Sequence, residues 1–280
     1  MLIHRDIPGL RAALGAWRAR GARIGLVPTM GALHDGHLSL VAAARAAADV
    51  VVASIFVNPT QFGPNEDLSR YPRDEAGDLA KLRAAGCDLA WLPTVEAMYP
   101  PGGATAVEVR GVSEGFEGAA RPGHFRGVAT VCTKLFLQTG ADAAAFGEKD
   151  WQQLQVVRRA ARDLDIPVRI LPVPTVREAD GLALSSRNRF LSPGERERAP
   201  LLHASLLRAA AAIAAGRDAA EALATGEDAL RRGGLMPDYL ALVEAETMRP
   251  LDRAAPGTAM RIVAAARLGT VRLLDNVAVP

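Results

Sequence analysis

Short apolar runs alternate with longer amphipathic stretches along the first 175 residues of the chain. The apolar runs cover residues 23–27, 50–57, 88–92, 143–146 and 168–173, and the stretches with helical spacing cover 37–48, 78–85, 126–138 and 150–163. The strand pattern also continues at 104–110, before a glycine-rich loop over 111–123. Alternation of this kind is typical of βαβ units, so the sequence predicts an α/β fold with a parallel sheet.

The pattern changes after residue 175. Residues 174–191 are polar and irregular, and Ser192 then precedes Pro193 and Glu195, which is typical of a helix start with a capping box. Two alanine-rich helices are expected at 193–215 and 217–232, followed by short strands at 239–244, 261–265 and 271–274. The sequence therefore predicts two domains: a parallel-sheet domain over residues 1–175 and a smaller α+β domain over 176–280.

Composition and charge narrow the class of protein. The chain has 280 residues, 49% of them hydrophobic, and its 33 basic and 31 acidic residues leave a net charge of +2. This balance gives no electrostatic surface for nucleic acid or an anionic membrane, and small-molecule partners are expected instead. The apolar runs are far shorter than the roughly 20 residues that span a bilayer. Residues 1–10 lack the apolar core of a signal peptide, so a cytoplasmic location is expected.

Two cysteines, Cys87 and Cys132, stand alone in the sequence without paired spacing. A chain of this length with two isolated thiols fits a reducing compartment better than a disulfide scaffold. We expect both to be buried free thiols.

In an open parallel sheet, ligands bind beyond the carboxyl ends of the strands, which directs attention to the loops after residues 27, 57, 146 and 173. The first loop contains Gly31 and Gly36, and it carries His34 and His37 three residues apart at the start of a helix. The glycines permit a close backbone approach to a ligand, and free amides at a helix start attract polyphosphate. Capping or packing is the structural alternative for the two histidines. A zinc site is a weaker alternative because no third ligand lies nearby.

The second loop places two side-chain amides, those of Asn58 and Gln61, after a continuous apolar run. Amides hold hydroxyl and carboxylate groups without adding charge. For Asn58 an Asn-Pro turn is an equally good structural explanation, whereas Gln61 has no such role in a turn.

The third loop contains Lys149, one of only three lysines among the 33 basic residues. A compact ammonium at a strand end suits a phosphoryl oxygen whose charge changes during a reaction. Asp150 and Gln153 also fit a capping box, and that structural role is compatible with ligand binding.

The fourth loop, residues 175–189, carries two hydroxyls, Ser185 and Ser186, followed by the guanidinium of Arg187. These groups are suited to phosphate oxygens, and the position at the predicted domain junction is compatible with a closing lid. A solvated polar linker is the structural alternative.

Taken together, these segments resemble the pantothenate synthetase family, the pantoate and beta-alanine ligases of the HIGH-type nucleotidyltransferase superfamily. The resemblance rests on residues 28–37, 58–62, 121–127, 147–150 with Gln153, and 184–188, in the family's order. The C-terminal third is similar only loosely, chiefly at residues 273–276. The resemblance implies a Rossmann-like ATP- and pantoate-binding domain and a smaller C-terminal lid domain.

The reaction that the resemblance implies has two steps. Pantoate attacks magnesium ATP (Mg2+ with ATP) to give pantoyl adenylate and pyrophosphate, and beta-alanine then displaces AMP to form pantothenate. Family members are typically cytoplasmic homodimers.

Site residues are implied by the same resemblance. His34, His37 and Lys149 contact the phosphates, and His37 is the proton donor. Gln61 and Gln153 hold pantoate. Gln61 also reaches the beta-alanine site, where Asn58 assists in binding beta-alanine. The implied ATP contacts are Met30, Gly31, Ala32, Leu33, His34, Asp35, Gly36, His37, Gly147, Glu148, Lys149, Asp150, Val176, Leu184, Ser185, Ser186 and Arg187, the last three also being counted as catalytic.

Two rival functions remain open at the level of sequence. A nucleotidyltransferase of the same superfamily would release pyrophosphate and keep the nucleotide on its product. A nucleotide-sensing module would have to explain why amides suited to an acid accompany the ATP loop. A tRNA-charging enzyme shares the histidine loop, but the balanced charge leaves no evident surface for tRNA.

Overall fold

The computed structural model describes residues 1–64, 66, 68–255 and 257–280. The chain folds into two compact units. The first consists of Met1–Glu148 and Val156–Pro174, and the second of Lys149–Gln155 and Thr175–Pro280. Residues 149–155, which follow the fifth strand, therefore group with the C-terminal part of the chain.

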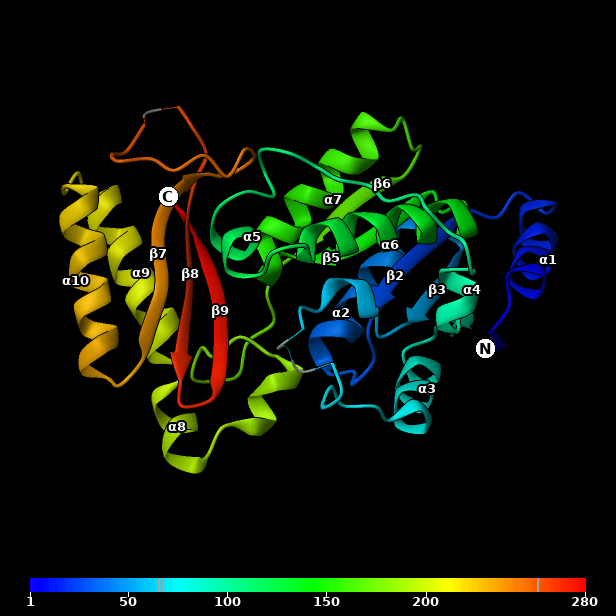
Figure 1. Cartoon of the computed structure of the whole chain (residues 1–280), viewed down its shortest axis with the longest axis horizontal. Helices are drawn as coiled ribbons and strands as arrows, with labels where there is room; N and C mark the ends of the chain where they lie inside the picture. Colours follow the sequence, from blue (N-terminus) through cyan, green and yellow to red (C-terminus); the bar gives the residue numbers. More distant parts are fainter. Residues whose placement is uncertain (65, 67, 256) are drawn as a thin grey trace. The chain divides into compact units, whose positions relative to one another are not determined.

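Within the described residues, the first unit is built on a parallel sheet of six strands in the order β1-β4-β3-β2-β5-β6 (Figure 1). The strands are β1 (Leu2–His4), β2 (Ile24–Thr29), β3 (Val50–Ile55), β4 (Leu89–Trp91), β5 (Ala143–Gly147) and β6 (Arg169–Val173). The predicted parallel sheet is thus confirmed. Strand residues of both parities, such as Leu26 and Val27, are fully buried, as expected for a sheet that is covered on both faces.

Helices alternate with these strands along the chain. They are α1 (Ile7–Arg18), α2 (Asp35–Ala47), α3 (Glu75–Ala84), α4 (Val95–Met98), α5 (Phe116–Ala120), α6 (His124–Thr139) and α7 (Trp151–Asp163), with short 3-10 turns η1 (Pro59–Gln61) and η2 (Glu148–Asp150). On one face Leu40, Val41 and Ala44 of α2 pack with Val51 and Ala53 of β3. The helix α6 packs against β2, α1 and η1.

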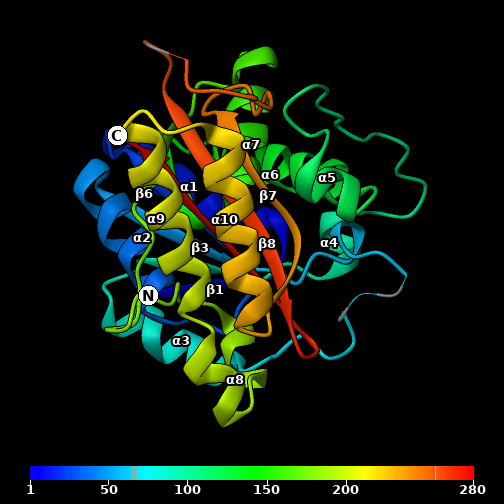
Figure 2. The same cartoon turned by 90° about the vertical axis from the view of Figure 1, so that its left-hand side faces the viewer.

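The second unit combines an antiparallel sheet with a helical layer. Its strands are β7 (Met236–Glu244), β8 (Met260–Leu268) and β9 (Val271–Val279), preceded by η3 (Ser186–Phe190), α8 (Pro193–Arg198), α9 (Leu201–Ala214) and α10 (Ala219–Arg232). Figures 1 and 2 show α9 and α10 side by side along one face of this sheet. Leu206 and Leu230 from the helices pack there with Ile262 and Leu273 from the strands.

Several predicted elements need correction. Residues 104–110 form no strand; most of them are exposed, and they have no partner strand. The predicted helix 193–215 is broken into α8 and α9 at Pro200, which lacks the amide hydrogen that a continuous helix needs. The strands β8 and β9 are also longer than predicted, and β1 and α1 were not predicted at all.

Burial and surface charge agree with the composition. Cys87 and Cys132 are buried free thiols, as predicted, and burial raises the pKa of Cys87 to about 11 and that of Cys132 to about 12.

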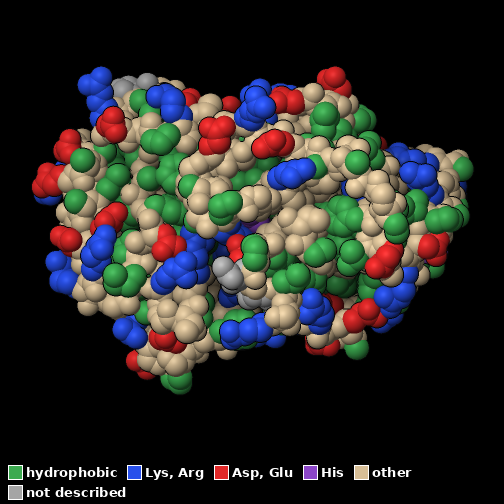
Figure 3. All heavy atoms as spheres, viewed as in Figure 1, with side chains coloured by type: hydrophobic (Ala, Val, Ile, Leu, Met, Phe, Trp, Pro, Cys, Tyr) green, Lys and Arg blue, Asp and Glu red, His purple; other side chains and the backbone are tan. Residues whose placement is uncertain are grey.

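Basic and acidic side chains are interspersed on the face shown in Figure 3. Among the described residues, no helix is both long enough and apolar enough to cross a bilayer.

Candidate active site

The candidate residues of the first unit follow the carboxyl ends of strands in its sheet. The strand β2 lies between β3 and β5, and all three are parallel, so their carboxyl ends meet at the same edge. The loop 30–37 follows β2, Asn58 and Gln61 follow β3, and Gly147 and Glu148 lie at the end of β5. The sheet thus brings these three predicted segments to a common edge, where ligands bind in open α/β folds.

The loop after β2 is held in an unusual backbone conformation. Gly31 has φ of 82° and Ala32 has φ of 51°, in the left-handed region that favours glycine. The amides of Ala32 and Leu33 donate to the two carboxylate oxygens of Asp78 at 2.8 and 2.7 Å. Lys81 donates through Nζ to the carbonyl of Leu33 at 2.7 Å. The helix α3 therefore fixes this loop from outside it.

The sequence did not predict a role for Asp78. Its side chain is almost completely buried, with an exposed fraction of 1%. The available signal is its position on α3: Asp78 and Leu82, four residues later, are the buried residues of that helix. A carboxylate on the inward face of a helix needs partners, and here the partners are the amides of the candidate phosphate loop.

The two histidines begin the helix α2. His34 is the N-cap residue, and its backbone amide donates to Nδ1 of His37 at 3.3 Å. The two rings lie 4.1 Å apart, measured between their centroids. Because Nδ1 of His37 accepts this bond, a neutral His37 carries its proton on Nε2. The pair thus has a capping role, and the same geometry leaves His37 as a donor through Nε2.

The two amides after β3 are buried and joined to each other. Nδ2 of Asn58 donates to Oε1 of Gln61 at 3.1 Å and to the carbonyl of Gly127 at 3.2 Å. Oδ1 of Asn58 accepts from the amide of Thr60 and from the hydroxyl of Tyr99. The Asn-Pro turn that was the structural explanation for Asn58 is therefore present. The same side chain also orients Gln61.

Gln61 also contacts the loop after β2, because its Nε2 lies 3.2 Å from Sδ of Met30. The backbone carbonyl of Gln61 accepts a hydrogen bond from Nδ1 of His124 at 2.9 Å and another from the guanidinium of Arg121 at 3.3 Å. Arg121 in turn forms an ion pair with Glu66 at 2.6 Å. These contacts show what Arg121 and His124 do in the structure, a role that the sequence did not predict.

His124 is buried and neutral. Burial lowers the pKa of His124 to about 4, and the neighbouring charge of Arg121 acts in the same direction. Because Nδ1 faces a carbonyl and Nε2 faces the guanidinium of Arg121 at 3.1 Å, the ring fits the Nδ1–H tautomer. His124 therefore acts as a fixed donor that positions Gln61.

The remaining candidates lie in the second unit. The ammonium of Lys149 is 3.6 Å from the carboxylate of Asp150, and the carbonyl of Lys149 accepts from Asn276 at 2.8 Å. Gln153 is half-buried in the first turns of α7.

The last predicted loop forms a narrow hairpin, also within the second unit. Arg177 and Ala183 form a β-bridge, and the amide of Leu184 donates to the carbonyl of Val176. Ser185 caps η3, because its Oγ accepts from the amide of Arg187 at 3.3 Å. Val176 and Leu184 are therefore brought together on this hairpin, and Ser185, Ser186 and Arg187 follow directly at η3.

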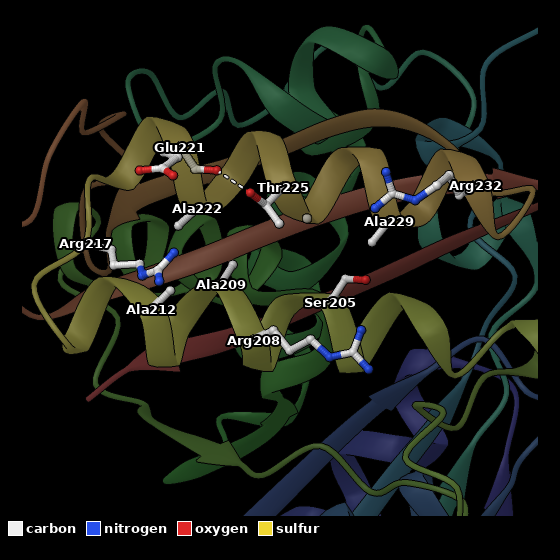
Figure 4. A pocket seen from close by; sticks show the side chains of 11 residues that line it. Ser205, Arg208, Ala209, Ala212, Arg217, Glu221, Ala222, Thr225, Ala229 and Arg232 are labelled. Carbon is white, nitrogen blue, oxygen red and sulfur yellow. Dashed lines mark hydrogen bonds between the residues drawn. The ribbon is translucent and has the colours of Figure 1, made fainter.

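A pocket in the second unit lies away from these candidate residues along the chain. It is a groove between α9 and α10, with a volume of about 230 Å³. Figure 4 shows small side chains such as Ala209 and Ala222 between the two helices and arginines such as Arg208 and Arg217 around them. None of its lining residues belongs to the predicted site.

In the part of the chain that the structure describes, no group of three or more His, Cys, Asp or Glu side chains is arranged to hold a metal ion. Among these residues, His34 and His37 therefore have no third ligand with which to form the zinc site that was the weaker alternative.

Comparison with known proteins gives matches over the full length. The family model of pantoate-beta-alanine ligase matches residues 2–278. A pantothenate synthetase of Acidiphilium cryptum (strain JF-5) is 63% identical over 280 residues, which is 100% of both chains. One of Rhizorhabdus wittichii is 58% identical over 280 residues, covering 100% of this chain and 99% of the relative.

Solved structures agree. A pantothenate synthetase from Thermus thermophilus matches with a TM-score of 0.93 and 52% identity, covering 100% of this chain and 99% of the other. A pantoate-beta-alanine ligase from Francisella tularensis, complexed with beta-gamma ATP and beta-alanine, matches with a TM-score of 0.82 and 33% identity, covering 99% and 97%. With a family model and close relatives that span essentially every residue, the chain belongs to the pantoate-beta-alanine ligase family.

Proposed function

We propose that this chain catalyses the ATP-dependent condensation of pantoate with beta-alanine to pantothenate, with pantoyl adenylate as the intermediate. The observation that carries the proposal is the edge of the parallel sheet, where a histidine pair at a helix start lies next along the sheet to a buried pair of amides. The first suits phosphates and the second suits a hydroxy acid. Family membership supports the same activity.

The chemistry requires two displacements. A carboxylate oxygen of pantoate attacks the α-phosphorus of ATP, the bond to the β-phosphate bridging oxygen breaks, and pyrophosphate leaves. The amine of beta-alanine then attacks the acyl carbon, the bond to the AMP oxygen breaks, and the amine loses a proton. Neither step needs a nucleophile from the protein, so positioning and charge neutralisation supply the catalysis.

In the first unit, loop 30–37 receives the nucleotide. His37 donates through Nε2 to a phosphate oxygen, since its Nδ1 is occupied by the amide of His34. Gln61 holds pantoate, with Met30 beside its amide and with Asn58, Arg121 and His124 fixing its orientation.

In the second unit, Lys149 neutralises charge on the phosphate oxygens, Asp150 contacts the ribose and Gln153 contacts pantoate. Val176 and Leu184 to Arg187 supply the further nucleotide contacts proposed for this unit. A hairpin held by its own backbone bonds suits this role, because a rigid support keeps charged donors at a fixed distance from the phosphates.

Magnesium enters as part of the nucleotide substrate. The described residues build no cluster of three metal-binding side chains, and magnesium in such sites is typically bound by phosphate oxygens and water with one or two carboxylates. The predicted ATP loop over residues 147–150 contains one aspartate, Asp150, whose carboxylate lies 3.6 Å from the ammonium of Lys149.

Exchange of labelled pyrophosphate into ATP tests the proposed function. Exchange should require pantoate but not beta-alanine, and adding beta-alanine should release AMP. Pyrophosphate release without free AMP would favour the rival nucleotidyltransferase, which keeps the nucleotide on its product. The relative from F. tularensis, complexed with beta-gamma ATP and beta-alanine, favours the ligase.

We further propose that the protein is a homodimer in the cytoplasm, as the family resemblance implies. Two buried free thiols fit a reducing compartment. Light scattering of the purified protein tests the oligomeric state: a monomer at micromolar concentration would contradict the proposed dimer.

A further inference from the structure

Two neighbouring polar residues, Asp275 and Asn276, are buried in the strand β9. Their exposed fractions are 2% and 4%, and the core residues Leu273 and Val277 lie close by on the same strand. Successive strand residues point to opposite faces of a sheet, so Asp275 shares the face of Leu273 and Val277 and Asn276 lies on the other. Buried polar groups are costly unless they are bonded, and each of these two has specific partners.

Asp275 binds the hairpin that follows β6. Both of its carboxylate oxygens accept from the guanidinium of Arg177, at 2.6 and 2.8 Å. Nδ1 of His203 lies 3.5 Å from the same carboxylate. Burial would raise the pKa of Asp275, but the hydrogen bonds from Arg177 and the nearby ring of His203 hold it below its ordinary value, so the carboxylate stays ionised.

Arg177 passes this constraint to the hairpin. Its guanidinium also donates to the carbonyl of Gly181 at 3.1 Å, and its backbone bridges to Ala183. The next bond along the hairpin joins the amide of Leu184 to the carbonyl of Val176. Val176 and Leu184 to Arg187 are the proposed nucleotide contacts, so Asp275 anchors the segment that presents them.

Asn276 binds the other nucleotide segment of this unit. Its Nδ2 donates to the backbone carbonyl of Lys149 at 2.8 Å, and its Oδ1 accepts from Arg261. The guanidinium of Arg261 lies 3.5 Å from the ring centroid of Trp151, and Nε1 of Trp151 donates to the carbonyl of Ala245 at 2.7 Å. The residues on both sides of Asp150 are therefore fixed to the second unit.

We propose that Asp275 and Asn276 are positioning residues that hold the Lys149 segment and the 176–187 hairpin in one fixed register for the nucleotide phosphates. The inference rests on the proposed function. Neither residue needs to touch substrate. Adjacent on one strand, they tie two segments that are about 30 residues apart in the sequence to the same support. A lysine side chain is flexible, so a fixed backbone carbonyl removes part of the freedom that would otherwise lower its effect on a reacting phosphate.

A double-mutant cycle on the whole protein tests the inference, with pantoate-dependent exchange of labelled pyrophosphate into ATP as the assay. Asn276→Ala should lower kcat for exchange roughly tenfold, because a misplaced electrostatic stabiliser is lost only in the transition state. In a Lys149→Ala background the same substitution should cost less than about twofold, because its effect passes through Lys149.

Two further variants separate positioning from folding. Asn276→Asp keeps an acceptor for Arg261 but loses the donor to Lys149, so it should also slow exchange and serves if Asn276→Ala folds poorly. Val277→Ala, the buried neighbour on β9, should lower Tm with near-normal kcat.

The inference would be overturned by normal kcat in the Asn276 variants, or by an equal loss of kcat in both backgrounds. It would also be overturned if Val277→Ala lost kcat in proportion to its fall in Tm. Absence of pantoate-dependent exchange in the wild-type protein would instead refute the proposed function itself, so the two failures are distinguishable.

Discussion

Single buried polar side chains fix the candidate site, and each does so by binding backbone. Asp78 accepts hydrogen bonds from two backbone amides of loop 30–37, Asn58 bridges the side chain of Gln61 and the carbonyl of Gly127, and His124 donates to the backbone carbonyl of Gln61. The sequence predicted the residues proposed to meet ligands, but not Asp78 or His124. Such residues were missed because their role depends on which backbone groups the fold brings to them, and no local pattern encodes that.

Removing the ammonium of Lys149 tests the proposed electrostatic role. Lys149→Ala should keep the fold and lower the rate of adenylate formation by roughly a hundredfold or more, as losing a fixed stabiliser of developing charge does. Pantoate-dependent pyrophosphate exchange measures this step. Lys134→Ala, on α6, is the matched control and should stay near wild type; a Lys149 variant with comparable turnover would argue against the role.

Neutralising Asp78 tests the support of the phosphate loop. Asp78→Asn keeps the size of the side chain but turns one of the two acceptors into a donor that faces an amide, so we expect a loss of about 1–3 kcal/mol in the free energy of unfolding. The KM for ATP should rise as the loop 31–33 relaxes. Urea denaturation and steady-state kinetics measure the two effects. Asp74→Asn, which retains a good helix cap, should change neither, and an unaffected Asp78 variant would show that the loop does not need its carboxylate.

Strands were predicted best where both of their faces are covered, because the sequence of such a strand is a continuous apolar run. The largely buried strands β2, β3 and β5 lie close to the predicted ranges, as does the more exposed edge strand β6, and the capping box at Ser192 is present. The predicted strand at 104–110 failed because an apolar alternation without a partner strand gains no ladder of hydrogen bonds, and these residues stay mostly exposed. The short edge strand β1 gave too little pattern to be noticed.

The contact between α6 and η1 is set by a glycine. A Cβ at Gly127 would lie 2.4 Å from the carbonyl oxygen of Thr60, so Gly127→Ala forces the two elements apart and should destabilise the protein by about 1–3 kcal/mol. Because Asn58 bonds to the carbonyl of Gly127, pantoate use should suffer more than ATP binding. Thermal unfolding and separate KM values check this. Gly194→Ala, where a Cβ meets nothing within 4 Å, should be neutral; equal behaviour of the two variants would contradict the packing argument.

For the whole molecule, stability should depend on pH through His124. Its pKa is about 4 in the folded protein against an ordinary value of 6.5, so between these values the unfolded chain binds a proton that the folded protein does not. Stability is therefore fully present above about pH 6.5 and falls as the pH drops toward 4, by at most about 3 kcal/mol from this group.

The variant His124→Asn isolates this effect, because asparagine keeps an N–H donor for the carbonyl of Gln61 but does not titrate. Denaturant unfolding of both proteins between pH 7 and 4 should show a flatter profile for the variant. Parallel profiles would mean that His124 is not the group responsible.

The sequence predicted the fold class and the family, because the four loops carry chemistry at strand ends and the alternation of elements requires a parallel sheet. It did not predict that residues 149–155 group with the C-terminal part of the chain. That grouping depends on long-range partners such as Asn276 and Ala245, more than 90 residues away, which local patterns cannot reveal.

Isotope transfer tests the central claim most directly. With pantoate labelled with ¹⁸O in its carboxylate, one labelled oxygen should pass to AMP when pantothenate is formed with beta-alanine, because that oxygen bonds to the α-phosphorus in the adenylate. Mass spectrometry of the released AMP detects it. Unlabelled AMP, or label found in pyrophosphate or inorganic phosphate, would contradict ligation through pantoyl adenylate.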